Sequence, residues 1–310
     1  MTKVAVVSEY TAAELASKDI PEPVWIVPGL LPAGLSLLAG KPKIGKSWLT
    51  LAIAVGVSNG TQVLDRSVGA QGVLYLALED NEQRLKTRLL ELLGDDDKPS
   101  ERLHFVNGWK SLAEGGLADL EARLAADPTI RLVVIDTLGR VRKSSKPGGN
   151  IYLEDYEIIA GLKAVADKFQ AGILCVHHTR KAHSADPFET ISGTTGLTGA
   201  ADTNMVLSRM GIAETVLHVN GRDVEEQHLA MKFDDGAWEV LGPAAKFCIS
   251  KSQQKIMTAL KESQKGPTDI ANATGLPLDS VKKDLKKLVG EGLLDHLDHG
   301  LYAHSSPPSL

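Results

Sequence analysis

Eight residues between Gly40 and Ser47 have types and a spacing that suit the binding of phosphate groups. The segment reads Gly40-Lys-Pro-Lys-Ile-Gly45-Lys46-Ser47 and matches the pattern G-x-x-x-x-G-K-S/T in full. Its glycines allow successive backbone N–H groups to face an anion, its lysine reaches the terminal phosphates, and its serine ligates magnesium. This pattern predicts a P-loop that binds ATP with Mg²⁺. The predicted nucleotide-binding residues are Gly40, Lys41, Pro42, Lys43, Ile44, Gly45, Lys46, Ser47 and Trp48.

A second candidate ligand for magnesium is Asp136, which ends the apolar run Leu132-Val-Val-Ile. A carboxylate at the end of a buried strand can hold a metal-bound water beside the serine of a P-loop. An aspartate in this position alone is more often a helix cap or a turn former. Because a P-loop precedes it, we interpret Asp136 as the partner of Ser47 at the metal.

Glu79 is the candidate general base, and Lys46 is the catalytic cation. Glu79 follows the apolar run that starts at Val73, and ligand groups gather at such strand ends in open parallel sheets. A carboxylate one water away from the terminal phosphate can orient the attacking nucleophile. The alternative is that Glu79 or Asp80 only caps a helix that starts near Asn81.

The elements that must position these residues follow an α/β pattern from Leu35 onward. Short apolar runs begin at Leu35, Val73, Leu103, Leu132 and Gly172, and longer amphipathic runs separate them. This alternation predicts a mostly parallel sheet flanked by helices. Closely spaced β-rich segments follow, and we expect them to form an antiparallel extension of the sheet. These segments are Met205 to Ser208, Thr215 to Val219, His228 to Phe233 and Trp238 to Leu241.

Glycine and proline residues and changes in hydrophobic periodicity divide the chain into three parts. We expect an N-terminal arm over residues 1–34, an ATPase domain over residues 35–245, and a second domain over residues 246–310. The periodicity of the second domain indicates three short helices followed by a hairpin that turns at His299 and Gly300. Three helices with a hairpin predict a winged-helix domain.

Composition sets further limits. The net charge of −5 argues against a globally basic nucleic-acid coat, although a local basic loop can still bind phosphates. Cys175 and Cys248 are the only cysteines and lack metal-site spacing, so we expect free thiols in a reducing compartment. No apolar stretch reaches the roughly 18 residues that a membrane span needs. We therefore expect a cytoplasmic protein.

Four motifs together resemble one family. The P-loop, Leu-Ala-Leu-Glu79-Asp80, Val-Ile-Asp136-Thr137 and Val-His177-His178-Thr-Arg-Lys181 resemble the RecA-like ATPases of plasmid and phage replication, in particular the RepA-type hexameric replicative helicases. The resemblance spans residues 25 to 240. It implies a hexameric ring with ATP between subunits, and it makes His178 the candidate sensor of the terminal phosphate. A purely structural histidine is the alternative for either ring, and adjacent strand residues cannot easily chelate one ion.

The resemblance also implies an arginine that completes the site from a neighbouring subunit. Arg209 and Arg222 are the candidates. The family places this arginine after a glycine-rich segment that resembles residues 192–202, yet Asn204 stands at that position here. Arg222 lies at a predicted turn, where a solvated arginine is an equal alternative.

Two basic loops follow the strands that end at Asp136 and His178. In RecA-like motors such loops hold single-stranded DNA in the pore of the ring, and solvated surface loops are the alternative. The candidate DNA contacts in these loops are Arg140, Arg142, Lys143, Lys146, Arg180 and Lys181.

A lysine stripe marks the last predicted helix of the second domain. It lies opposite the apolar residues Val281, Leu285 and Leu288, and we expect a DNA-recognition helix that contacts duplex phosphates. A solvated face on a protein-docking module is the alternative, because Asp295 and Asp298 make the hairpin acidic. The stripe consists of Lys282, Lys283, Lys286 and Lys287.

Taken together, these features predict a ring-forming, DNA-associated ATPase, namely a replicative helicase or translocase of a plasmid, phage or integrated element. An ATP-gated DNA-binding or loading factor without strand separation is the first alternative. A small-molecule phosphotransferase is the second, and the basic loops and the winged helix argue against it.

Overall fold

The structure is a computed structural model that describes residues 10–20, 22–94, 98–142, 151–180, 184, 186–193, 195–210, 214–246, 250–261, 263–290 and 293–304. The expected DNA contacts Lys143, Lys146 and Lys181 lie outside these residues, as does Cys248. Over the same ranges, no helix combines the length and apolar character needed to cross a bilayer.

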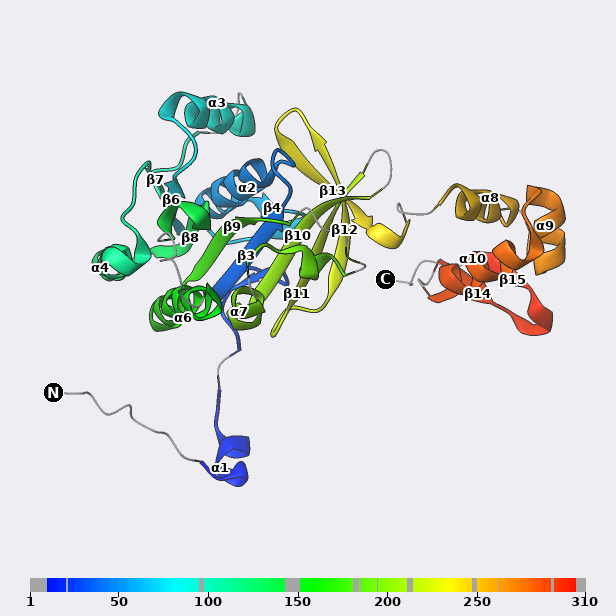
Figure 1. Cartoon of the computed structure of the whole chain (residues 1–310), viewed down its shortest axis with the longest axis horizontal. Helices are drawn as coiled ribbons and strands as arrows, with labels where there is room; N and C mark the ends of the chain where they lie inside the picture. Colours follow the sequence, from blue (N-terminus) through cyan, green and yellow to red (C-terminus); the bar gives the residue numbers. More distant parts are fainter. Residues whose placement is uncertain are drawn as a thin grey trace.

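A nine-stranded sheet forms the centre of the protein (Figure 1). Its central parallel strands are buried runs of branched and aliphatic residues, and all seven residues of the strand before the P-loop are buried. In spatial order the strands are β13 (Ala237–Pro243), β12 (Gln227–Asp234), β11 (Glu214–Gly221), β10 (Thr203–Met210), β3 (Gly34–Gly40), β9 (Gly172–His178), β8 (Ile130–Asp136), β6 (Gly72–Ala77) and β7 (Leu103–Val106).

Six strands of this sheet, from β7 to β10, run parallel. The expected antiparallel extension is present but starts one strand later than the sequence suggested. β10 pairs in parallel with β3, and only β11, β12 and β13 are antiparallel. The reason lies in helix α7 (Thr195–Ala200), which returns the chain to the amino edge of the sheet so that Thr203 pairs with Ser36.

Helices cover both faces of the sheet, as the continuous apolar strands require. Helix α2 (Lys46–Asn59) covers one face, where its apolar residues cluster with Leu38. Helices α4 (Gly116–Ala126) and α6 (Ile151–Phe169) cover the other face, where their apolar residues cluster with Leu35 and Leu37. Figure 1 shows α2 and α3 (Glu82–Leu93) on one side and α4 and α6 on the other. Cys175 is buried in the second cluster, and burial raises the pKa of its thiol to about 12.

The segment before the sheet contains one exposed helix and two short strands. Helix α1 (Ala12–Ser17) has no buried residue. Strands β1 (Trp25–Val27) and β2 (Leu31–Pro32) pair with each other, and their buried residues belong to the main core. The end of the N-terminal segment is therefore part of the body of the protein. A second small pair, β4 (Gln62–Val63) and β5 (Arg66–Ser67), follows α2.

The C-terminal elements enclose a core of their own. Ile256, Ile270 and Leu285 come from three successive helices and pack with Leu294 of a two-stranded sheet. A short turn joins the two strands, and Gly300 adopts a positive φ of 71° within it. The elements are α8 (Lys251–Ala259), α9 (Pro267–Thr274), α10 (Leu278–Gly290), β14 (Leu294–His296) and β15 (Tyr302–His304).

Candidate nucleotide site

The P-loop joins strand β3 to helix α2 and turns tightly at two points. Lys43 and Gly45 have positive φ values of 63° and 101°, and Gly45 is the N-cap of the helix. A glycine tolerates this conformation at little cost. A Cβ atom on Gly40 would lie 2.9 Å from the carbonyl oxygen of Leu207, so only glycine fits where β3 ends against β10. The backbone therefore curls into the first turn of α2, where free N–H groups attract anions.

The side chain of Lys46 folds back along this loop. Its Nζ donates hydrogen bonds to the carbonyl oxygens of Gly40 (2.8 Å) and Lys41 (3.0 Å), and the residue is 6% exposed. Burial lowers the pKa of Lys46, while the nearby charges of Asp136 and Glu79 oppose that shift. The ammonium group is thus held over the phosphate loop by acceptors that phosphate oxygens could replace.

Strand register brings the other predicted residues to the same edge of the sheet. Asp136 pairs with Ala77, two positions before Glu79, and His178 pairs with Gly40. The carboxyl ends of parallel strands therefore deliver all three side chains to one cleft of about 600 Å³. Residues that line the cleft are Pro42, Lys43, Ile44, Gly45, Lys46, Ser47, Trp48, Glu79, Asp80, Arg84, Arg88, Asp136, Thr137, His178, Arg209, Thr215, Phe233 and Trp238.

Asp136 is buried beside the start of α2. Its Oδ2 accepts a hydrogen bond of 3.0 Å from the hydroxyl of Tyr75, whereas its Oδ1 is buried without a hydrogen-bond partner. Burial raises the pKa of Asp136, and hydrogen bonds from Ser47 and Tyr75 oppose the shift. An unsatisfied carboxylate oxygen next to a serine hydroxyl fits a hydrated Mg²⁺, which takes few protein ligands and keeps waters and phosphates. The described part of the chain has no cluster of three His, Cys, Asp or Glu residues that could hold a metal ion.

Glu79 lies at the mouth of the cleft, with its side chain 44% exposed. Its Oε1 accepts a hydrogen bond of 3.1 Å from the hydroxyl of Thr137 and lies 3.8 Å from Nε of Arg140. The helix cap is a different residue, because the side chain of Asn81 accepts from the N–H of Arg84 at the start of α3. Glu79 is therefore available for another role, and it faces the same space as Ser47.

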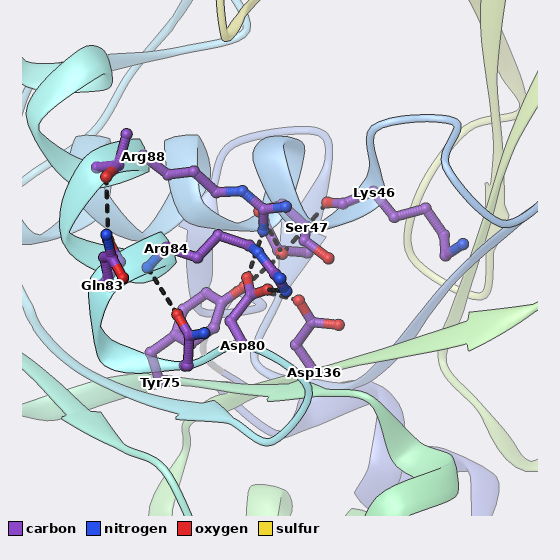
Figure 2. A network of polar contacts seen from close by, with 11 residues as sticks. Lys46, Ser47, Tyr75, Asp80, Gln83, Arg84, Arg88 and Asp136 are labelled. Carbon is purple, nitrogen blue, oxygen red and sulfur yellow. Dashed lines mark hydrogen bonds and ion pairs between the residues drawn. The ribbon is translucent and has the colours of Figure 1, made fainter.

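Asp80 sits between two arginines that sequence reasoning missed. Figure 2 shows Arg84 and Arg88 of α3 converging on Asp80 close to Asp136 and Ser47. Arg84 lies 3.0 Å from Asp80, and the guanidinium of Arg88 also stacks 5.2 Å from the ring centre of Trp48. The spacing D-x₃-R-x₃-R, in which one residue per turn faces one side of a helix, is the signal that could have predicted this cluster.

Tyr75 is a second residue that the sequence did not single out. It points from the interior of β6 towards α2, and its hydroxyl lies 2.9 Å from that of Thr50 as well as 3.0 Å from Asp136. Burial raises the pKa of Tyr75 well above its usual value, with the charge of Asp136 as the next cause. The phenol therefore remains a hydrogen-bond donor. In sequence, Tyr75 looks like one more apolar residue of a buried strand.

The two histidines at the end of β9 differ in their surroundings. His178 lines the cleft, and its Nδ1 is buried without a hydrogen-bond partner. His177 points elsewhere, since its Nε2 lies 3.1 Å from the carbonyl oxygen of Ser192. Burial lowers the pKa of His177, and its contact with Ser192 opposes the shift. This arrangement favours His178 over His177 as a residue that contacts ligand.

The two candidate arginines lie at opposite edges of the sheet, Arg209 towards the P-loop and Arg222 at the amino edge of the parallel strands. Arg209 lines the cleft of its own chain. Arg222 follows Gly221, which pairs with Thr203 at the amino edge, and its side chain contacts Gly199 and Asp202. Of these two arginines, Arg222 therefore lies away from the nucleotide loop of its own chain.

The candidate DNA contacts also differ in how they are held. Arg140 of helix α5 (Leu138–Val141) has a side chain that is 61% exposed. Arg142 forms an ion pair with buried Asp155, and Arg180 donates a hydrogen bond of 3.1 Å to the carbonyl oxygen of Ile191. In the C-terminal elements, four lysines of α10 are exposed, namely Lys282, Lys283, Lys286 and Lys287.

The parallel sheet, the phosphate loop at its carboxyl edge and the buried aspartate beside it define a P-loop protein with a RecA-like fold. The chain belongs to the AAA domain family AAA_25, which matches residues 5–184. The sequence prediction of a RecA-like P-loop protein is thereby confirmed at the level of the fold.

Two solved structures share this fold. The ATPase domain of G40P is 16% identical, with a TM-score of 0.54 over 67% of this chain and 85% of that domain. A DnaB-like replicative helicase, solved for its interactions with primase, is 15% identical, with a TM-score of 0.55 over 73% of this chain and 66% of that one. Identities this low show a common fold. No curated protein sequence matches the chain.

Proposed function

We propose that this protein hydrolyses ATP and couples the reaction to DNA, as a ring-forming replicative helicase or translocase of a plasmid, phage or integrated element. One observation carries the proposal. Lys46 with Ser47, Glu79 and Asp136 come from three separate points of the chain and line one cleft at the carboxyl edge of the sheet. Membership of the AAA domain family and the fold shared with helicase ATPase domains support it.

Each residue has a defined part in the proposed hydrolysis. The P-loop amides and Lys46 bind the phosphates. Ser47 and Asp136 would hold a magnesium ion, which would neutralise charge on the phosphate oxygens. Glu79 orients the water that attacks the terminal phosphate and accepts its proton. His178, adjacent to Gly40, contacts the terminal phosphate and senses its loss. None of these residues provides the further positive charge that would stabilise the terminal phosphate as it is transferred to water.

Arg222 supplies that charge from a neighbouring subunit in our proposal, because it lies at the edge of the sheet opposite its own P-loop. Arg209, which lines its own cleft, would act within one chain. A hexameric ring with nucleotide between subunits would place Arg222 beside a second P-loop. Loss of turnover in an Arg222→Ala chain, with rescue when it is mixed with Lys46→Ala chains, would support action in trans.

DNA contact is assigned to two regions. The loops after β8 and β9 line the pore and bind a single strand, and their exposed cations among the described residues are Arg140 and Arg180. The C-terminal domain is a winged helix, and α10 binds duplex phosphates through Lys282, Lys283 and Lys286. Reversing these three charges in the full chain should weaken duplex binding and reduce its salt dependence. The same reversal at the exposed residues Lys18, Lys98 and Lys110 is a control of equal charge.

The experiment that tests the function is ATP turnover without DNA, with single-stranded DNA and with duplex DNA, beside unwinding of a forked duplex. We expect stimulation by single strands and unwinding, both lost in Lys46→Ala. Stimulation without unwinding would instead favour an ATP-gated loading factor. In that alternative ATP controls assembly, and the winged helix provides the specificity for DNA without strand separation. Turnover that ignores every form of DNA would refute both functions.

A further inference from the structure

Three aromatic side chains form one wall of the nucleotide cleft. Trp48 belongs to the first turn of α2, whereas Phe233 and Trp238 flank the turn between β12 and β13. The ring centre of Phe233 lies 6.0 Å from that of Trp48 and 5.0 Å from that of Trp238. Both distances are within the range of tilted aromatic pairs. Two segments separated by more than 180 residues therefore meet to form a continuous aromatic surface.

This surface is fixed to the P-loop itself. Nε1 of Trp238 donates a hydrogen bond of 3.1 Å to the carbonyl oxygen of Gly45. A Cβ atom on Gly45 would lie 2.7 Å from the Trp238 ring, and one on Gly236 would lie 2.8 Å from the Trp48 ring. The backbone of the loop thus lies against the ring of Trp238, and the hairpin turn lies against the ring of Trp48. Both tryptophan rings therefore contact either the phosphate-binding loop or the turn that packs on it.

Phe233 is different, because its ring is 42% exposed. It is the one exposed large hydrophobic residue among the described residues that lines this cleft. Its two neighbours already provide the packing that holds the hairpin against the P-loop. An aromatic ring that is supported from behind and open in front is suited to stack on another planar ring.

The direction of a bound nucleotide follows from the carboxylates. Glu79 and Asp136 must lie at the terminal phosphate if they serve hydrolysis, and they stand at the ends of β6 and β8. β12 and β13 lie at the other end of the sheet, beyond β3. With its phosphates held at the start of α2, a nucleotide therefore extends its base away from the carboxylates and towards the aromatic wall.

We propose that Phe233, backed by Trp48 and Trp238, is the platform on which the base of the bound nucleotide stacks. This inference rests on the nucleotide binding proposed above. The strength of stacking depends on the area of the base and not on its hydrogen-bonding groups. The platform should therefore favour purines over pyrimidines without selecting one purine. The proposal thus also predicts that ATP and GTP bind with similar affinity.

The test measures binding of ATP, GTP, CTP and inorganic tripolyphosphate, each with magnesium, to the full chain by calorimetry. Tripolyphosphate is the probe that lacks a base. Phe233→Ala should weaken ATP binding by roughly tenfold, the loss expected for one stacked base, and leave tripolyphosphate binding unchanged. Phe233→Tyr should retain affinity, whereas Phe233→Leu should not. Leu90→Ala, which removes an exposed apolar side chain outside the cleft, is the matched control.

Three outcomes would overturn the proposal. The first is unchanged ATP affinity in a folded Phe233→Ala protein. The second is a changed oligomeric state with unchanged affinity, which would assign Phe233 to a contact between copies. The third is wild-type protein that binds ATP no more tightly than tripolyphosphate. Failure of the wild-type chain to bind either compound would instead refute the nucleotide site as a whole.

Discussion

The hydroxyl of Tyr75 donates a hydrogen bond of 3.0 Å to the carboxylate of Asp136 and lies 2.9 Å from the hydroxyl of Thr50. This contact links strand β6, strand β8 and helix α2 at the proposed metal position. It satisfies one oxygen of Asp136 and leaves the other free for a hydrated cation. Tyr75 therefore acts as a positioning residue for the aspartate.

Tyr75→Phe should weaken the response to magnesium. Loss of a hydrogen bond that orients a metal ligand typically reduces metal affinity or activity by roughly 10- to 100-fold. We expect turnover to require a higher magnesium concentration, with the affinity for metal-free nucleotide unchanged. Tyr302→Phe in the C-terminal elements is the control and should leave the magnesium dependence unaltered. An unchanged magnesium titration in Tyr75→Phe would remove the proposed role.

Glu79→Gln should separate binding from turnover. The amide keeps the shape of the side chain but cannot accept a proton, and loss of a general base typically costs about 10²- to 10⁴-fold in rate. Nucleotide affinity, measured by calorimetry, should stay within about twofold of wild type, because no phosphate-binding group is changed. Glu101→Gln, on an exposed turn, is the matched control. Normal turnover in Glu79→Gln would show that the base is another residue.

Arg140 connects the proposed DNA-binding loop to the proposed base, since its Nε lies 3.8 Å from Glu79. DNA phosphates that attract Arg140 would release Glu79 to act on water. Arg140→Ala should therefore raise turnover without DNA and reduce stimulation by single-stranded DNA. Arg102→Ala removes an exposed arginine elsewhere and should change neither rate. Full stimulation in Arg140→Ala would exclude this coupling.

Asp80→Asn should destabilise the fold around the cleft. Two arginines converge on Asp80, whose side chain is 14% exposed, and Arg88 in turn stacks on Trp48. We expect a loss of about 1–3 kcal/mol in the free energy of unfolding, measured by urea denaturation. The control is Asp119→Asn, which breaks an exposed pair with Lys110 and should cost well under about 1 kcal/mol. Equal effects of the two substitutions would contradict this account.

His218 should make the protein less stable in acid. Burial and the neighbouring His228 lower its pKa from 6.5 to about 4, while Asp186 opposes the shift. Between these values the unfolded chain binds more protons than the folded one, so stability is present above about pH 6.5 and falls as the pH drops towards 4. The loss attributable to His218 is about 2 kcal/mol at pH 5.

Urea unfolding at pH 7.5 and pH 5 measures this effect. Nδ1 of His218 lies 2.9 Å from Nδ1 of His228, and its Nε2 lies 2.9 Å from the hydroxyl of Ser208, so a glutamine can keep a polar contact there. His218→Gln should reduce the difference in the free energy of unfolding between pH 7.5 and pH 5. The control is His104→Gln, at an exposed position, which should not. An equal difference in all three proteins would contradict the shift.

Much of the fold follows from local chemistry that the sequence displays. Strands β3, β8 and β9 are continuous apolar runs because helices cover both faces, and Gly45 lies where a positive φ is needed. The direction of β10 could not be inferred in the same way. It depends on the short helix α7 in a glycine-rich segment, whose helical preference is weak without its packing on α6.

The residues of the site also divide into those that the sequence reveals and those that it does not. Lys46, Ser47 and Asp136 belong to contiguous patterns with a known spacing, so their types alone reveal them. Phe233 and Trp238 reach the cleft only because the sheet brings the β12–β13 turn beside the P-loop, a contact between segments far apart in sequence. Local spacing carries no information about such a contact.

The central claim is that the P-loop and Asp136 form one magnesium–nucleotide site. The most direct measurement is the melting temperature of wild-type, Lys46→Ala and Asp136→Asn proteins with and without saturating ATP and magnesium. A ligand at 100 times its dissociation constant stabilises by about 2.7 kcal/mol, which should raise the wild-type value by several degrees. We predict this rise in the wild type, none in Lys46→Ala, and one in Asp136→Asn that no longer depends on magnesium. A wild-type melting temperature that does not change when ATP and magnesium are added would contradict the account.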